Sequence, residues 1–161
     1  MAEESLKELY NKDFPLWAEK NLQLLREKAY DQVDWGNLLE EIEDMARSDL
    51  KACVSHLAVV LEHLYKWDHF RNLAGGEVAG RSWIKSVNNA RTDIEAILET
   101  YPSLAPKLPQ ELDKAWIQAK SRLKKWLENN DYEPKNFPIP NECPYTYEEA
   151  MNRDLKKEAN S

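Results

Sequence analysis

The feature that most constrains the fold is a long run of apolar residues at helical spacing between Trp35 and Trp67. Apolar side chains recur every three or four residues along this run, which is the period of one face of an α-helix. No proline and no glycine interrupts the run after Gly36, and Asp34 before it is a favourable N-cap residue. The pattern therefore predicts one unusually long helix from about residue 35 to residue 67.

The rest of the chain also repeats at helical period. We expect further helices over residues 14–28, 82–101 and 109–129, the second of which must end before Pro102, because proline disfavours helical geometry in the residue that precedes it. Four prolines over residues 134–144 predict an extended, irregular tail. Without any alternating strand pattern, these elements predict an all-α fold, a bundle of about four main helices with an irregular proline-rich C-terminal tail and a short last helix.

Capping residues mark the expected helix starts. Asp13 with Pro15 in the first turn begins the first helix, and Ser82 is expected to cap the helix that follows the glycine-rich stretch. Thr146 and Glu149 have the spacing of a capping box for the last short helix. We expect a single helical domain over residues 1–161, with its core over about 12–151 and flexible termini.

Charge and composition exclude several classes of function. The net charge of −7 disfavours binding to nucleic-acid phosphates, and we expect the basic residues over 120–125 to be a solvated helix face. The chain opens on polar, acidic residues and contains no apolar run long enough to cross a bilayer. Two cysteines form no disulfide framework. We expect a cytoplasmic protein that binds neither membranes nor nucleic acids.

The stretch GGEVAGRS, residues 75–82, fits the pattern of a phosphate-binding loop except that Arg81 replaces the lysine. Such a loop needs a buried strand before it, and here a helix precedes it, so we do not expect nucleotide hydrolysis. We interpret the glycines as a connection between helices that supplies positive φ. Arg81 would then lie at the start of the helix capped by Ser82, where free N–H groups favour an anion, which could be a carboxylate of the protein itself.

Two other groups of residues have the chemistry of a site. The stretch LEEIEDM, residues 39–45, places Glu41 and Glu43 on a helix, but the chain has no Glu-x-x-His pair to complete a bundle metal site. We therefore expect no metal and no cofactor. His56 and His63 are two turns apart, about 10 Å of rise, too far to bind one ion. We expect a partly buried His63 beside Trp67.

Several short motifs occur in an order that resembles a known bacterial family. They are DFPLW, LLREKAYDQVDWGNLLEEIEDM, HLYKW, RSWIKSV, YPSL and FPIPNECPYTYEEAM. Together they resemble the domain-of-unknown-function family numbered twenty-nine, which is abundant in cyanobacteria, over residues 12–151. The resemblance implies a small, all-helical, stand-alone cytoplasmic domain and carries over no catalytic role, because no activity is established for the family.

The family's motif positions fall at Asp34, Trp35, Glu41, Glu43, His63, Trp67, Ser82, Trp83 and the segment from Cys143 to Thr146. The chain departs from the family pattern at DHFRNLAGGEVAG, residues 68–80, where the family usually has glutamine, proline and several arginines. The resemblance therefore gives no function to the glycines, while Arg81, Ser82 and Trp83 stay in register.

Two hypotheses about function follow. The first is a non-enzymatic module that binds a protein partner or forms a homodimer, since six tryptophans and a long helix come without a complete catalytic set. The second is an enzyme or a protein that binds an anion or small ligand in a polar pocket between helices. Its candidate residues are Glu41, Glu43, His63, Trp67, Arg81, Ser82 and Trp83. On one continuous helix Glu43 and His63 would be about 30 Å apart, which ranks this hypothesis second.

Overall fold

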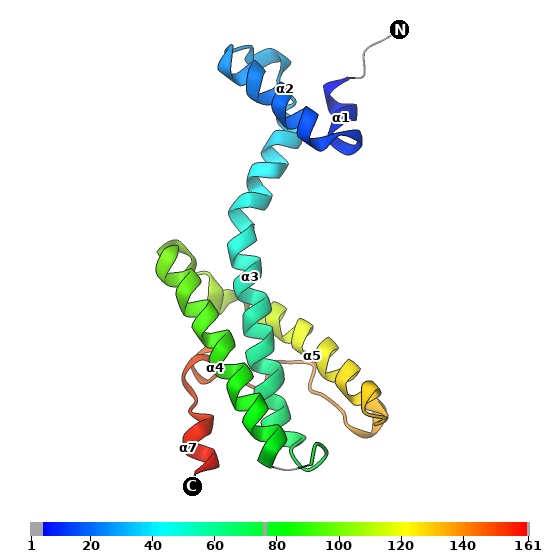
Figure 1. The fold of residues 1–161 in the computed structure, drawn as a ribbon, viewed down its shortest axis with the longest axis vertical. Helices are drawn as coiled ribbons and strands as arrows, with labels where there is room; N and C mark the ends of the chain where they lie inside the picture. The colour runs from blue at the N-terminus through cyan, green and yellow to red at the C-terminus, as the bar shows by residue number, and fades with distance from the viewer. Residues whose placement is uncertain (1–4, 76, 161) are drawn as a thin grey trace. The chain divides into compact units, whose positions relative to one another are not determined.

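The structure, a computed structural model, describes residues 5–75 and 77–160 and is all-α, as predicted (Figure 1). No described residue lies in a strand. The helices are α1 (Leu6–Lys12), α2 (Phe14–Arg26), α3 (Trp35–His69), α4 (Glu77–Thr100), α5 (Leu112–Asn129), α6 (Tyr147–Asn152) and α7 (Leu155–Ala159). Short 3₁₀ helices lie at Tyr30–Gln32, Pro102–Leu104, Leu108–Glu111 and Pro134–Asn136.

The chain forms two compact units, Met1–Ser48 and Asp49–Ser161, and α3 contributes to both. The long helix predicted over residues 35–67 is confirmed, with its end at His69. The single domain expected from the sequence stays a prediction. It would be supported if fluorescence and circular dichroism reported one coincident unfolding transition.

The first unit is built around Trp17, which is almost fully buried. Its indole N–H donates to Asp34 Oδ2 over 2.9 Å, and the backbone N–H of Asp34 donates to Asn21 Oδ1 over 3.0 Å. The rings of Tyr10 and Phe14 pack against Trp17 with centroid distances of 5.0 and 5.4 Å. These contacts tie α1 and α2 to the first turn of α3.

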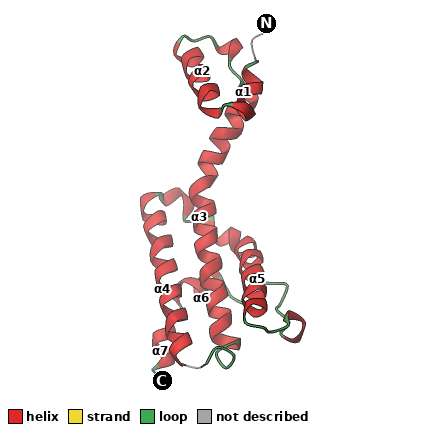
Figure 2. Cartoon of the chain, turned by 45° about the vertical axis from the view of Figure 1, so that its right-hand side comes forward, coloured by secondary structure: helices red, strands yellow, loops and turns green. Residues whose placement is uncertain are grey.

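The second unit has the larger core. The second half of α3 packs with α4 and α5 (Figure 2). Its innermost side chains are Cys53, Leu57, Leu61 and Leu64 of α3, Val87 and Ile94 of α4, and Trp116, Leu123 and Leu127 of α5. The proline-rich segment packs against this core through Phe137 and Ile139. The indole N–H of Trp116 also donates to the carbonyl of Pro140 in this segment over 3.1 Å. A buried indole needs such an acceptor.

The predicted start of the helix after the glycine-rich stretch is wrong. Helix α4 begins at Glu77, so Ser82 lies in its second turn and is not its N-cap. Gly80 is therefore helical, and Gly75 alone among the described glycines has positive φ, at 86°, while Gly76 lies outside the described residues. The glycines of residues 75–80 therefore led us to predict too long a loop.

The capping box of Thr146 and Glu149 is confirmed, and it begins α6. This helix is not the last one, because α7 follows it.

Candidate functional site

The residues proposed from the sequence fall in both units. Glu41 and Glu43 belong to the first unit, and His63, Trp67, Arg81, Ser82 and Trp83 belong to the second. Glu41 accepts a hydrogen bond from the hydroxyl of Tyr10, a bond that raises the pKa of Tyr10 to about 12. Glu43 pairs with Arg47 one turn along the helix at 2.9 Å. Both carboxylates therefore have partners within their own unit.

His63 lies in the second unit beside a buried carboxylate. Its Nδ1 is 2.7 Å from the carbonyl oxygen of Val59, an acceptor, so Nδ1 is the donor. Its Nε2 is 3.9 Å from Glu62 Oε2. Burial lowers the pKa of His63, although the charge of Glu62 opposes this effect. The neutral ring is therefore the form that the fold favours.

Glu62 and Lys66 form a buried ion pair in the middle of the second unit. Lys66 Nζ donates to Glu62 Oε2 over 2.7 Å, and both residues are less than a tenth exposed. The ammonium lies 5.0 Å from the ring centroid of Trp126 and 6.0 Å from that of Trp83. Trp83, which was proposed as a ligand-binding residue, thus packs beside the Lys66 ammonium in the protein interior.

Trp67 and Arg81 line a cavity of about 480 Å³, which we call the arginine cavity. Its other polar lining residues include Asp68, Arg71, Asn72 and Glu158. The guanidinium of Arg71 stacks on the Trp67 ring at 4.0 Å from the centroid, and its Nε donates to the carbonyl of Trp67 over 2.8 Å. The structure thus brings together two of the proposed ligand-binding residues, Trp67 and Arg81.

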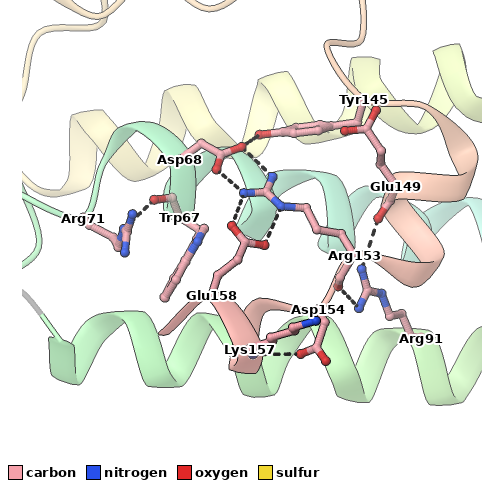
Figure 3. Close-up of polar contacts among 10 residues, drawn as sticks. All are labelled: Trp67, Asp68, Arg71, Arg91, Tyr145, Glu149, Arg153, Asp154, Lys157 and Glu158. Carbon is pink, nitrogen blue, oxygen red and sulfur yellow. Dashed lines mark hydrogen bonds and ion pairs between the residues drawn. The ribbon is translucent and has the colours of Figure 1, made fainter. Parts of the chain in front are cut away.

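One wall of the arginine cavity is held by Arg153, which lies between two carboxylates (Figure 3). Its Nη1 and Nη2 donate to the two oxygens of Asp68 over 2.8 and 2.6 Å. Its Nε and Nη2 donate to the two oxygens of Glu158 over 2.9 and 2.8 Å. The hydroxyl of Tyr145 adds a bond of 2.7 Å to Asp68. All three guanidinium nitrogens and both carboxylates are therefore engaged.

These contacts also set the pKa values of the network. Burial alone would raise the pKa of Asp68, but the hydrogen bonds from Arg153 and Tyr145 outweigh it and lower the pKa. The bonds from Arg153 likewise lower the pKa of Glu158. Burial, with the hydrogen bond to Asp68, raises the pKa of Tyr145. At neutral pH the network therefore consists of two carboxylates, one guanidinium and a neutral phenol.

Arg91 of α4 holds the segment that carries Arg153. Its three nitrogens donate to the carbonyls of Ala150, Arg153 and Glu149 over 2.8, 2.7 and 3.2 Å. Because the last carbonyls of a helix have no partner within it, a buried guanidinium satisfies the end of α6. Neither Arg91 nor Arg153 was singled out from the sequence, since Arg91 finds its partners about 60 residues away and Arg153 finds Asp68 85 residues away.

A second feature lies in the first unit, on α3. Trp35, Leu39, Ile42 and Met45 are 43, 59, 52 and 72% exposed. Their spacing of four, three and three residues places them on one side of the helix, and we call them the apolar face. The indole N–H of Trp35 donates to the carbonyl of Tyr30 over 2.7 Å, which fixes the ring. The sequence periodicity identified Trp35, Leu39 and Ile42, but as part of the packed face of a bundle, and it did not include Met45.

The fold defines the class of the protein, a small all-helical protein with a cavity lined by charged side chains in its second unit. The chain belongs to the family described as "Domain of unknown function DUF29", whose model matches residues 9–155. This confirms the resemblance seen in the sequence motifs. No curated protein and no solved structure matches the chain.

Two further observations concern the part of the chain that the structure describes. Within residues 5–75 and 77–160, no group of three or more His, Cys, Asp or Glu residues is placed to hold a metal ion. None of the helices over the same residues combines the length and the apolar character needed to span a bilayer.

Proposed function

We propose that the chain is a non-enzymatic protein-interaction module that binds its partner through the apolar face of α3. The observation that supports this is the exposure of four large apolar side chains, each at least 43% exposed, along one side of one helix. Large contiguous apolar surfaces are uncommon on monomeric proteins and are typical of interaction sites. A stripe at this spacing is also how a helix presents itself to a groove or to another amphipathic helix.

Charge indicates the kind of partner. Glu40, Glu41, Glu43 and Asp44 all lie on the same three turns of α3, with Arg47 as the basic residue of this stretch. Arg47 is already paired with Glu43. An amphipathic helix with basic residues beside its apolar stripe would match both the apolar face and its acidic surroundings. We therefore propose a basic amphipathic helix as the partner.

A second copy of the chain is a weaker candidate for the same surface. It would bring the same four acidic side chains against their own copies, and like charges placed opposite one another disfavour association. The proposal therefore expects the chain to stay monomeric while it binds a basic helix. Analytical ultracentrifugation over a range of concentrations separates the two cases.

The direct test uses two synthetic peptides with leucines at positions i, i+3, i+4 and i+7, one with lysines and the other with glutamates at the remaining positions. We expect the lysine peptide to shift the backbone amide NMR signals of residues 35–46 in a saturable way, and the glutamate peptide to leave them unchanged. Ile42→Glu should abolish the binding, because it places a charge in the middle of the apolar face.

Asn11→Glu is the matched control. Asn11 is exposed on α1 of the same unit, so the variant adds the same charge to this unit on a helix that does not carry the apolar face. It should bind the lysine peptide as the wild type does. The proposal is wrong if both variants weaken binding equally, if both peptides bind alike, or if the shifts map outside residues 35–46.

A further inference from the structure

We infer that the arginine cavity binds a small organic anion through a carboxylate or phosphate group. The cavity has a volume of about 480 Å³, which is within the range of small-molecule sites, about 300–1,000 Å³. It lies in the second unit and shares no residue with the apolar face, so this inference does not depend on the proposed interaction.

The charge balance of the cavity favours an anion. Asp68 and Glu158 are its two described carboxylates, and Arg153 binds both of them. Arg71 and Arg81 line the cavity, and Arg153, which lies behind the two carboxylates and does not line it, is a third guanidinium group against these two carboxylates. Among the side chains that the structure describes, this leaves one positive charge in excess, and the carboxylates are already engaged with Arg153.

Arg71 and Arg81 have donors to offer. Arg71 uses its Nε for the carbonyl of Trp67, and the stacking of its guanidinium on the Trp67 ring fixes the plane of the group. Its two terminal nitrogens form no hydrogen bond with any described residue. Arg81 is exposed and has no ion pair with a described side chain. A planar guanidinium held in this way suits the two oxygens of a carboxylate or phosphate.

The remaining walls indicate what such an anion carries. Trp67 and Ile84 provide apolar surface, and Asn72 provides an amide. A small apolar or aromatic molecule with an anionic group would contact the guanidinium groups, the apolar side chains and the amide of the cavity. The anion site expected at the start of the helix after Ser82 is not the one supported here, because Ser82 lies in the second turn of α4. The side chains of Arg71 and Arg81 carry the inference instead.

The test is a titration of the whole chain with inorganic phosphate and, separately, with benzoate, at constant ionic strength. Binding is followed by the NMR signals of the Trp67 indole N–H and the Arg71 Nε–H. We expect saturable shifts of both signals. Binding of phosphate alone indicates a phosphate ligand with little use of the apolar walls, whereas tighter binding of benzoate indicates an aromatic carboxylate.

Arg81→Gln should weaken binding by about tenfold or more, the loss expected when one charge-assisted partner is removed. Lys85→Gln is the matched control, because Lys85 is exposed one turn further along α4 and does not line the cavity. It should change the affinity by less than about twofold, as for other exposed charges. The inference is overturned if neither anion binds in a saturable way. It is also overturned if the two variants have equal effects, which would indicate diffuse electrostatic attraction.

Discussion

Gly80 lies against the indole ring of Trp67, so close that a Cβ on Gly80 would be 2.9 Å from Trp67 Cζ3. Trp67 cannot easily move away, because it is 4% exposed and its ring is covered by Arg71. A glycine inside a helix costs about 1 kcal/mol relative to alanine. Here α4 approaches α3 too closely for a side chain at position 80, which explains why a glycine lies inside the helix.

Gly80→Ala should therefore destabilise the protein by about 1–3 kcal/mol, the usual cost of overpacking a core. Gly36→Ala is the matched control, since its Cβ would meet nothing within 4 Å and Gly36 is in the first turns of a helix. It should stabilise the protein by up to about 1 kcal/mol through helix propensity. Urea unfolding of the two variants measures both effects. A stabilising Gly80→Ala would contradict this interpretation of the contact.

The sequence was sufficient to predict the long helix α3 but not its surroundings. Periodicity shows that Trp35, Leu39 and Ile42 share a face with Leu57 and Leu64, and the structure covers only the latter part of that face. What covers a helix face depends on which other segments reach it, and a local pattern does not carry that information. The exposed part is the surface on which the proposed interaction depends.

The candidate cavity could be predicted only in part. Trp67 was proposed from the family motifs and Arg81 from the stretch GGEVAGRS. Asp68 and Arg153 were not proposed, because 85 residues separate the two members of this ion pair. The misplaced start of α4 has a related cause. Gly80 was assigned to the loop on the basis of its residue type, whereas its packing against Trp67 places it in the helix.

Arg91→Met should release the C-terminal helices from α4. The variant leaves the carbonyls of Glu149, Ala150 and Arg153 without the donors that Arg91 provides. We expect a loss of about 2–4 kcal/mol in the free energy of unfolding, since a buried acceptor without a donor is costly.

Hydrogen exchange distinguishes this local effect from a general loss of stability. The amides of α6 and α7 should lose protection before those of α5. Lys85→Met, an exposed change on the same helix, should alter the free energy of unfolding by no more than about 0.5 kcal/mol. Equal loss of protection in all three helices would argue against a specific anchoring role for Arg91.

Lys66→Met alone should destabilise the protein more than the double variant that replaces both Lys66 and Glu62. Removing the ammonium leaves the carboxylate of Glu62 buried, with Arg122 and His63 each 3.9 Å away, at a cost of about 3 kcal/mol. Replacing both members with Lys66→Met and Glu62→Leu removes the stranded charge, so much of that loss should be recovered. A double-mutant cycle by urea unfolding measures the coupling. Strictly additive effects would show that the pair is not coupled.

The carboxylates that bind Arg153 should make stability depend on pH in the acidic range. Their pKa values are lowered in the folded protein from ordinary values of 3.8 for Asp68 and 4.5 for Glu158. The unfolded chain therefore binds more protons than the folded one over this range. The stabilisation is fully present above about pH 4.5–5 and is lost as the pH falls through the folded pKa values.

Asp68→Asn tests this directly, because it removes the charge and keeps an oxygen that can accept from Tyr145. At pH 7 the variant should be less stable than the wild type by about 1–3 kcal/mol, the value of a charged hydrogen-bonded partner. The difference should shrink as the pH is lowered from about 5 to 3, since the wild-type carboxylate also becomes protonated. Glu99→Gln, at an exposed position of α4, should stay within about 0.5 kcal/mol of the wild type at pH 7. Urea unfolding at pH 7 and between pH 5 and 3 provides all three comparisons. If the stability difference between Asp68→Asn and the wild type does not change with pH, the Asp68 carboxylate does not stabilise the fold through its charge.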